Sequence, residues 1–368
     1  MEPLAVYVHI PFCPSKCGYC DFNSYAMTGD IMARNTAAMI AEIRRSPAYG
    51  RPAKTIFFGG GTPTYIPVDQ LLAILEAVTE AHPPLPDCEV TSEANPGTVD
   101  ATKFSAMRAA GFNRISLGAQ SFLDSDLLAL ERVHKSGEID CAVAAAREAG
   151  FENLNLDLMF ALPGQSLFAW RRNLSKALSL RPDHLSLYCL TIEQNTAFYK
   201  KQLRGQLDLP DDDAQVAMYD ECLARVAEAG FEQYEISNFA KPGLECRHNM
   251  AYWRGEEYAG YGPGAVGCLA VTGKWIRSTN LKHPERYCAA VENNQPLAFE
   301  SEALDEATQH TERIMLGLRL NAGIPVDWVP AEALTRMVKR GWVQAVAGRL
   351  RLTPEGRHFC SEATLVLL

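Results

Sequence analysis

Short runs of apolar and β-branched residues recur along the first 190 positions, and longer amphipathic segments separate them. An apolar run of this length is typical of a strand that is buried on both faces, whereas apolar residues spaced three and four apart indicate a helix. The runs predict strands at Leu4–Ile10, Lys54–Phe58, Cys88–Glu93, Arg114–Leu117, Leu154–Met159 and Leu185–Leu190. The segments between them predict helices at Ile31–Arg45, Val68–Ala81, Ala101–Ala110, Ile139–Ala149 and Phe168–Leu180.

Several of the predicted helices end in the same tripeptide. Ala-Gly-Phe occurs at Ala110–Phe112, at Ala149–Phe151 and, after a further predicted helix, at Ala229–Phe231. A glycine just past the last periodic residue is a signal for the end of a helix. Repeated strand–helix units with short connections indicate a parallel sheet with right-handed crossovers. Six units are enough for a partial barrel or an open sheet, and the pattern alone does not choose between them.

The remainder of the chain has a different pattern. Residues 231–300 are rich in Gly, Asn, Tyr and Trp and show few helical periods, so we expect an irregular linking region after a first domain at 1–230. Residues 301–368 predict a small α+β domain of winged-helix type. Its expected elements are two helices and two short strands, at Glu302–Leu320, Pro330–Arg340, Val343–Val346 and Arg349–Leu352.

The composition narrows the class of protein. The 368 residues carry a net charge of -9, which argues against nonspecific binding of nucleic acid because a phosphate backbone needs a basic surface. The 11 cysteines are odd in number and mostly scattered, so we predict a reducing compartment rather than a disulfide framework. The start of the sequence shows no secretory signal, and no apolar run reaches the roughly 20 residues of a spanning helix. We therefore expect a cytoplasmic protein.

Three cysteines are crowded into one loop directly after the first predicted strand. Cys13, Cys17 and Cys20 have the spacing C-x3-C-x2-C. Thiolates hold iron–sulfur clusters, and three of them leave one iron of a four-iron cluster without a protein ligand. Such an open position allows chemistry at a metal centre. The alternative is a structural zinc site in which His9 supplies the fourth ligand.

The spacing of these cysteines resembles the signature of the radical SAM superfamily. The resemblance implies a partial (β/α)6 barrel with the C-terminal winged-helix-like domain appended to it. It also implies a [4Fe-4S] cluster on Cys13, Cys17 and Cys20 whose open iron binds S-adenosylmethionine. Reduction of the cluster can then cleave that cofactor to a deoxyadenosyl radical, chemistry that belongs to the cofactor while the protein positions it.

Further residues are candidates for the cofactor pocket. Gly59-Gly60-Gly61-Thr62 follows the second strand, where glycines let the backbone approach a ligand, although a tight turn alone would also explain them. Asp157 lies within an apolar strand, and a buried carboxylate needs a partner or a ligand. The resemblance implies that the pocket is lined by Tyr7, Gly60, Gly61, Thr62, Glu93, Gln120, Arg132 and Asp157.

The sequence around the cysteines is similar to one branch of the superfamily. Tyr7-Val8-His9-Ile10-Pro11-Phe12-Cys13 and Cys20-Asp21-Phe22 resemble the branch that contains oxygen-independent coproporphyrinogen III oxidase and the HemW-like haem chaperones. The oxidases carry another cysteine at the position of Phe22 and a longer arm before the cluster, whereas only 12 residues precede Cys13 here. Both differences favour a haem chaperone. The alternative is an enzyme, a coproporphyrinogen III dehydrogenase-type oxidoreductase.

A second motif, His248-Asn249-x-x-Tyr252-Trp253, supports a role in haem binding. Imidazole is a common axial ligand of haem iron, and Tyr and Trp offer flat apolar area to a macrocycle. Without the resemblance, His248 would more often be a packed histidine beside two aromatic residues. The resemblance favours a haem site at His248, Tyr252 and Trp253, with Cys246 as a weaker candidate ligand.

The resemblance also implies partners. We expect haem and apo-haemoprotein acceptors at the inner membrane, with the protein itself cytoplasmic or peripheral to that membrane. We expect no nucleic-acid partner, and either a monomer or a haem-linked dimer.

Overall fold

The computed structural model describes residues 2–368, and its main feature is a curved sheet of 12 strands. Six of these strands are parallel and lie side by side in chain order, which confirms the predicted α/β class with a parallel sheet. They are β1 (Leu4–Ile10), β2 (Ala53–Gly60), β3 (Pro84–Ala94), β4 (Arg114–Gln120), β5 (Asn153–Phe160) and β6 (His184–Cys189).

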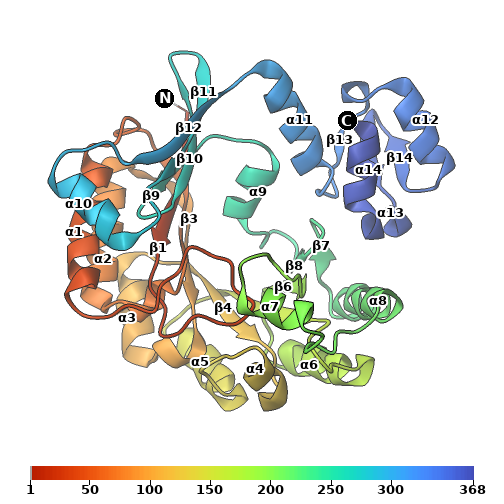
Figure 1. The fold of residues 1–368 in the computed structure, drawn as a ribbon, viewed down its shortest axis with the longest axis horizontal. Coiled ribbons are helices and arrows are strands. Elements are labelled where there is room, and N and C mark those ends of the chain that lie inside the picture. The colour runs from red at the N-terminus through yellow and green to blue at the C-terminus, as the bar shows by residue number, and fades with distance from the viewer. Residues whose placement is uncertain (1) are drawn as a thin grey trace.

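Helices cover the outer face of these six strands, as Figure 1 shows. Alternate strand residues such as Leu4, Val6 and Val8 are fully buried in the main core beneath the helices. The residues between them face the inside of the curve, so each strand has an apolar outer side and a more polar inner side. The helices are α1 (Asp30–Arg44), α2 (Val68–Ala81), α3 (Ala101–Ala110), α4 (Asp124–Ala129), α5 (Ser136–Glu148), α6 (Leu167–Ser179) and α8 (Asp212–Glu228).

Residues 231–300 are not irregular, and that expectation was wrong. They extend both edges of the sheet and add two helices. At the β6 edge lie β7 (Glu232–Gln233) and β8 (Asn238–Ala240), which run antiparallel. At the β1 edge, β9 (Tyr258–Tyr261) pairs in parallel and β10 (Val266–Val271), β11 (Lys274–Asn280) and β12 (Ala298–Leu304) follow antiparallel. The two helices are α9 (Arg247–Trp253) and α10 (Pro284–Glu292).

The C-terminal residues form a smaller unit with its own apolar core, in the upper right of Figure 1. The two predicted strands occur at the predicted residues, whereas the first helix begins later than expected, at Glu306, because Ala298–Leu304 joins the main sheet. The elements are α11 (Glu306–Gly317), β13 (Ile324–Pro325), α12 (Ala331–Lys339), β14 (Val343–Val346), β15 (Arg349–Leu352), α13 (Pro354–His358) and α14 (Cys360–Leu367).

Polar contacts join this unit to the rest of the chain. His358 Nε2 lies 3.2 Å from an Asp220 carboxylate oxygen on α8, and Arg319 lies 4.0 Å from Glu235. Among residues 2–368, no helix combines the length and apolar character that crossing a membrane would require.

Candidate functional site

The cysteine loop leaves the carboxyl end of β1 and is closed at its base. The Cys13 amide donates to the Tyr25 carbonyl at 3.1 Å, and the Tyr25 amide donates to the Pro11 carbonyl at 2.7 Å. Within the loop, the Cys20 amide donates to the Cys17 carbonyl. Cys13, Cys17 and Cys20 all line one cavity of about 480 Å³. The loop therefore presents its three thiols to a common space at the carboxyl ends of the strands, where barrel sites are built.

Each thiol has a polar neighbour from outside the Cys13–Cys20 loop. Cys13 Sγ lies 3.4 Å from Thr62 Oγ1, and Cys20 Sγ lies 3.9 Å from Ser24 Oγ. An Arg132 Nη1 hydrogen points at Cys17 Sγ over 3.6 Å. Burial raises the pKa of Cys13 and of Cys20.

The zinc alternative needs His9 as a fourth ligand beside the three cysteines. Within the described part of the chain, no three His, Cys, Asp or Glu side chains are grouped to hold one metal ion. His9, the fourth ligand of the zinc alternative, uses both ring nitrogens elsewhere. Nδ1 lies 3.0 Å from the Tyr7 hydroxyl, and Nε2 lies 2.8 Å from the Asn23 carbonyl oxygen. His9 would have to break a hydrogen bond before it could bind a metal.

The glycine turn after β2 is both a tight turn and a wall of the cavity. Gly60 has a φ of 109°, which favours glycine, and a Cβ there would lie 2.5 Å from the His9 ring. A Cβ on Gly61 would lie 2.7 Å from the Phe12 carbonyl oxygen. Gly60, Gly61 and Thr62 all line the cavity of the cysteines. The glycines therefore bring the backbone of this turn against the start of the cysteine loop.

Two carboxyl groups lie deeper in the same cavity. Glu93 Oε2 accepts from the Gly60 amide at 3.1 Å, and burial, followed by the charge of Asp157, raises the pKa of Glu93 to about 8. Asp157 accepts from Ser116 Oγ at 3.1 Å and from Asn155 Nδ2 at 2.7 Å. Burial still raises the pKa of Asp157. Asp157 therefore has protein partners, and it also lines the cavity.

Gln120 and Arg132 complete the wall of this outer cavity. Gln120 has a φ of 62° beside an irregularity in the β4–β5 pairing, and such strained conformations of non-glycine residues cluster at functional sites. Arg132 Nη2 donates to the Gly118 carbonyl at 3.1 Å, while its buried Nε has no partner in residues 2–368. The structure thus brings seven of the eight predicted pocket residues to one cavity, and Tyr7 lies beyond it.

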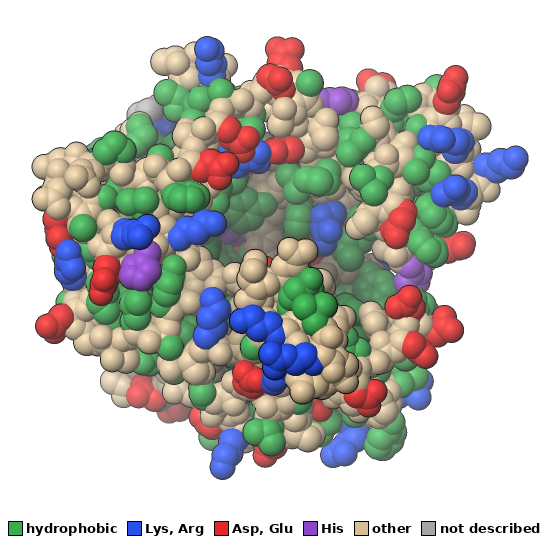
Figure 2. All heavy atoms as spheres, in the orientation of Figure 1, with side chains coloured by type: hydrophobic (Ala, Val, Ile, Leu, Met, Phe, Trp, Pro, Cys, Tyr) green, Lys and Arg blue, Asp and Glu red, His purple; other side chains and the backbone are tan. Residues whose placement is uncertain are grey.

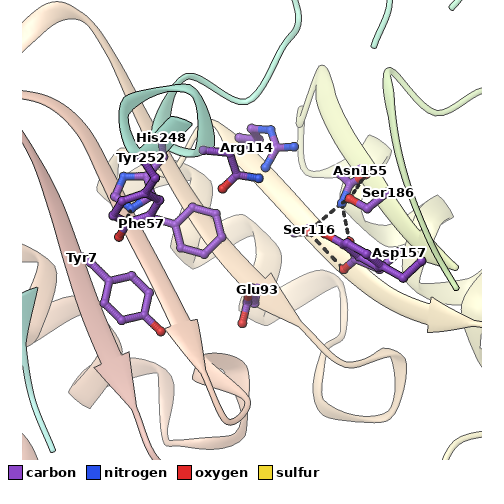
Figure 3. A pocket seen from close by; sticks show the side chains of 12 residues that line it. Tyr7, Phe57, Glu93, Arg114, Ser116, Asn155, Asp157, Ser186, His248 and Tyr252 are labelled. Atoms are coloured by element: carbon purple, nitrogen blue, oxygen red, sulfur yellow. Dashed lines mark hydrogen bonds between the residues drawn. The ribbon is translucent and has the colours of Figure 1, made fainter. Parts of the chain in front are cut away.

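Tyr7 lines a second, inner chamber of about 310 Å³ inside the curve of the sheet (Figure 3). The chamber adjoins the outer cavity, because both are lined by Glu93, Ser116, Asp157 and Tyr188. Its lining includes Asn249 of the predicted haem motif and residues that sequence reasoning missed, namely Phe57, Arg114, Ser116, Asn155, Ser186 and Tyr188. The signal was present in the strict polar–apolar alternation of Asn153–Asp157, which marks a polar inner face on a strand.

The predicted haem motif lies on α9, which forms one side of the inner chamber. Glu89 of β3 holds the start of this helix, because its carboxylate accepts from the Arg247 and His248 amides at 3.0 and 3.1 Å. His248 Nδ1 lies 2.9 Å from Thr55 Oγ1, and Nε2 lies 3.0 Å from the Tyr252 hydroxyl. Burial lowers the pKa of His248 to about 3. The ring is therefore neutral, with both nitrogens engaged.

The members of this motif do not all face the same space. His248 and Tyr252 line the inner chamber, and the His248 ring stacks on Phe57 with ring centres 4.9 Å apart. Trp253 does not line it, and the Arg319 guanidinium lies over the Trp253 ring at 4.7 Å. An iron ligand role for His248 would require one of its hydrogen bonds to open, and the haem role of this motif stays a prediction.

Comparisons with known proteins agree on one family. A sequence model described as the Radical SAM superfamily matches residues 7–172. The protein named heme chaperone HemW in Escherichia coli is 42% identical over 374 residues, which cover 98% of this chain and 96% of that protein. HemW of Mycobacterium tuberculosis is 37% identical and covers 100% and 95% of the two chains. HemW of Bacillus subtilis is 36% identical over 97% of each.

A solved structure shares the fold over the whole chain. The radical SAM coproporphyrinogen III oxidase HemN of Escherichia coli superposes with a TM-score of 0.85 at 23% identity. The match covers 100% of this chain and 90% of that one. The predicted partial (β/α)6 radical SAM barrel with a C-terminal appendage is confirmed.

Proposed function

This chain belongs to the HemW family of the radical SAM superfamily, and on that premise we propose that it is a haem chaperone. It binds haem and transfers it to apo-haemoproteins, and it carries a four-iron cluster and S-adenosylmethionine. The observation that carries the proposal is the similarity to HemW proteins over nearly the full length of both chains.

The outer cavity supports the cofactor part of the proposal. Its three thiols come from one closed loop, and Gly60, Gly61 and Glu93 line the same cavity. Cys13, Cys17 and Cys20 would hold three irons of the cluster and leave the fourth to S-adenosylmethionine. The polar groups available to orient that cofactor are the Thr62 hydroxyl, the Glu93 and Asp157 carboxyls and the Arg132 guanidinium. When bound, the reduced cluster supplies an electron to the cofactor.

The surroundings of the cluster loop support a chaperone rather than an oxidase. Phe22 occupies the position of the further cysteine of the oxidases, and its side chain is 65% exposed at the mouth of the cavity. An exposed phenyl ring cannot ligate metal or exchange a hydrogen atom as a thiol can. The likeness to HemN, at 23% identity, concerns the fold.

The test separates the two activities in one preparation. Anaerobically reconstituted protein is given coproporphyrinogen III, reductant and S-adenosylmethionine, and separately haem. We expect stoichiometric haem uptake, seen by its absorption, and no conversion of coproporphyrinogen. Accumulation of protoporphyrinogen, or the absence of haem uptake, would contradict the proposal.

A further inference from the structure

Arg114 of β4 is a buried cation without a partner. Its side chain lines the inner chamber and is only 2% exposed (Figure 3). Its guanidinium makes no ion pair and no hydrogen bond with any residue in 2–368, and its buried Nε is unsatisfied. Burying an unpaired charge is costly, and native arginines at such positions are paired or bind a ligand. The buried charge of Arg114 therefore indicates a negatively charged ligand that is not part of the chain.

The carboxylates around Arg114 are engaged by other groups. Glu89 caps the start of α9, and Glu93 accepts from the Gly60 amide. Asp157 accepts from Ser116 and Asn155, and the Asn155 amide also donates to Ser116 Oγ at 2.7 Å and to Ser186 Oγ at 3.0 Å. These acids lie at a distance from the guanidinium, and none of them is in contact with it. They lower the free-energy cost of burying it.

Another residue of the chamber lining offers a second free donor. The Asn249 side chain, next to His248 on α9, lines the chamber and makes no hydrogen bond with the described residues. The His248 nitrogens, in contrast, are taken by Thr55 and Tyr252. The groups left open in this chamber thus include a guanidinium and an amide, both of which donate hydrogen bonds.

We propose that the inner chamber is a carboxylate site, in which Arg114 and Asn249 bind one carboxylate of an organic ligand. A planar guanidinium matches a carboxylate with two parallel hydrogen bonds. A volume of about 310 Å³ lies at the low end for small-molecule pockets, so it suits a small acid or the acidic arm of a larger ligand. This deepens the proposed function, on which it rests, because haem carries two propionate arms of this chemistry.

The binding test compares haem with its ester, which lacks the free carboxylates, and with a small free carboxylate. Reconstituted protein is titrated with haem, with haem dimethyl ester and with propionate ion, as wild type, as Arg114→Gln and as the control Arg172→Gln, which changes an exposed arginine. We expect wild type and Arg172→Gln to prefer haem over its ester by about tenfold or more, and Arg114→Gln to lose that preference.

The outcomes distinguish the source of the carboxylate. If haem and its ester bind equally while propionate ion raises the unfolding temperature of wild type and not of Arg114→Gln, the site takes a free acid. If haem and ester bind equally and propionate has no effect that depends on Arg114, the inference is overturned although the chaperone function stands. If wild type binds no haem at all, the proposed function fails. The titration with propionate ion then still tests whether the chamber binds a carboxylate.

A stability measurement separates a ligand site from a structural cation. Without ligand, Arg114→Gln should leave the unfolding temperature unchanged or raise it, because it removes an unpaired buried charge. A lower unfolding temperature would show that Arg114 stabilises the fold by balancing the charge of the surrounding acids, and would overturn the inference. Arg114→Lys keeps the charge without the planar fork, and we expect it to retain part of the preference for haem over the ester.

Discussion

At the scale of single residues, the concave face of the barrel concentrates ionisable groups that burial holds away from their usual protonation states. Glu93 is the clearest case, with a pKa raised to about 8, mainly by burial and then by the charge of Asp157. A carboxyl that is largely protonated near neutrality can donate a hydrogen bond to a ligand. It also makes the stability of the fold depend on pH.

The pH dependence has a definite sign. The folded pKa of Glu93 lies above the unfolded value of about 4.3. The contribution of this group to the free energy of unfolding is therefore fully present at low pH and is lost as the pH rises towards 8. The free energy of unfolding should fall by up to about 1.4 kcal/mol per pH unit in this window from this group alone. In urea unfolding without ligand, the free energy of unfolding of Glu93→Gln should change less between pH 5 and pH 8 than that of wild type. An unchanged slope would show that Glu93 is not the responsible group.

The cysteine loop gives a second prediction at this scale. Changing Cys13, Cys17 or Cys20 to Ala should abolish the four-iron cluster, since two thiolates do not hold it. Iron, sulfide and visible absorption measure the loss. Cys141→Ala is the matched control, because Cys141 is an exposed cysteine on α5 and should leave all three unchanged. A Cys17→Ala protein with full iron and sulfide would contradict the assignment.

The roles of individual residues could be predicted from the sequence to different extents. The cysteine spacing, the glycine turn and the lone acid Asp157 each carry a local signal, and the structure brings them to one cavity. No local pattern predicted the hydrogen bond between His248 and Thr55. The two residues lie 193 positions apart and meet only through the packing of α9 on β2. Arg114 could have been singled out from the alternation Arg-Ile-Ser-Leu, in which its neighbours on one face are polar.

At the scale of elements, the turn between β2 and α2 joins the cysteine loop to the sheet. The Gly61 amide donates to the Ile10 carbonyl at 2.7 Å, and the Thr62 amide donates to the Phe12 carbonyl at 2.8 Å. These bonds hold the turn directly against the residues that precede Cys13. Any side chain at Gly61 has to displace that backbone.

Gly61→Ala should therefore damage both the fold and the cluster. Its Cβ would lie 2.7 Å from the Phe12 oxygen and 2.9 Å from the Ile10 oxygen, so we expect a loss of about 1–3 kcal/mol in unfolding free energy and reduced cluster content. Gly137→Ala on α5 is the control, because nothing lies within 4 Å of its Cβ position. That variant should be neutral or gain up to about 1 kcal/mol. Equal behaviour of the two variants would contradict this account of the turn.

The elements of the barrel were predictable where strands are long and apolar. Strands β1 to β6 have six or more residues each and lie at the predicted places. The short β7, β8 and β9 have two to four residues and include Gly, Asn and Gln, so no period could reveal them. Their pairing depends on an existing sheet edge, which a local pattern does not contain.

At the scale of the whole molecule, the chain crosses the open side of the barrel between β8 and β9. It leaves the sheet at β8, beyond β6, and returns at β9, beside β1. Helix α9 lies on this crossing and carries His248, Asn249 and Tyr252 to the inner chamber. Figure 2 shows that this face of the molecule is hollowed near its centre. The crossing therefore places the second motif of the sequence beside the site built by the first.

Transfer of haem is the measurement that tests the central claim most directly. Haem-loaded protein, reconstituted anaerobically, is mixed with apomyoglobin as a general haem acceptor, and the absorption of holomyoglobin is followed in time. The account predicts that holomyoglobin forms as the haem spectrum of the chaperone disappears, with the cluster intact. Haem that stays on the protein in the presence of excess acceptor would contradict it.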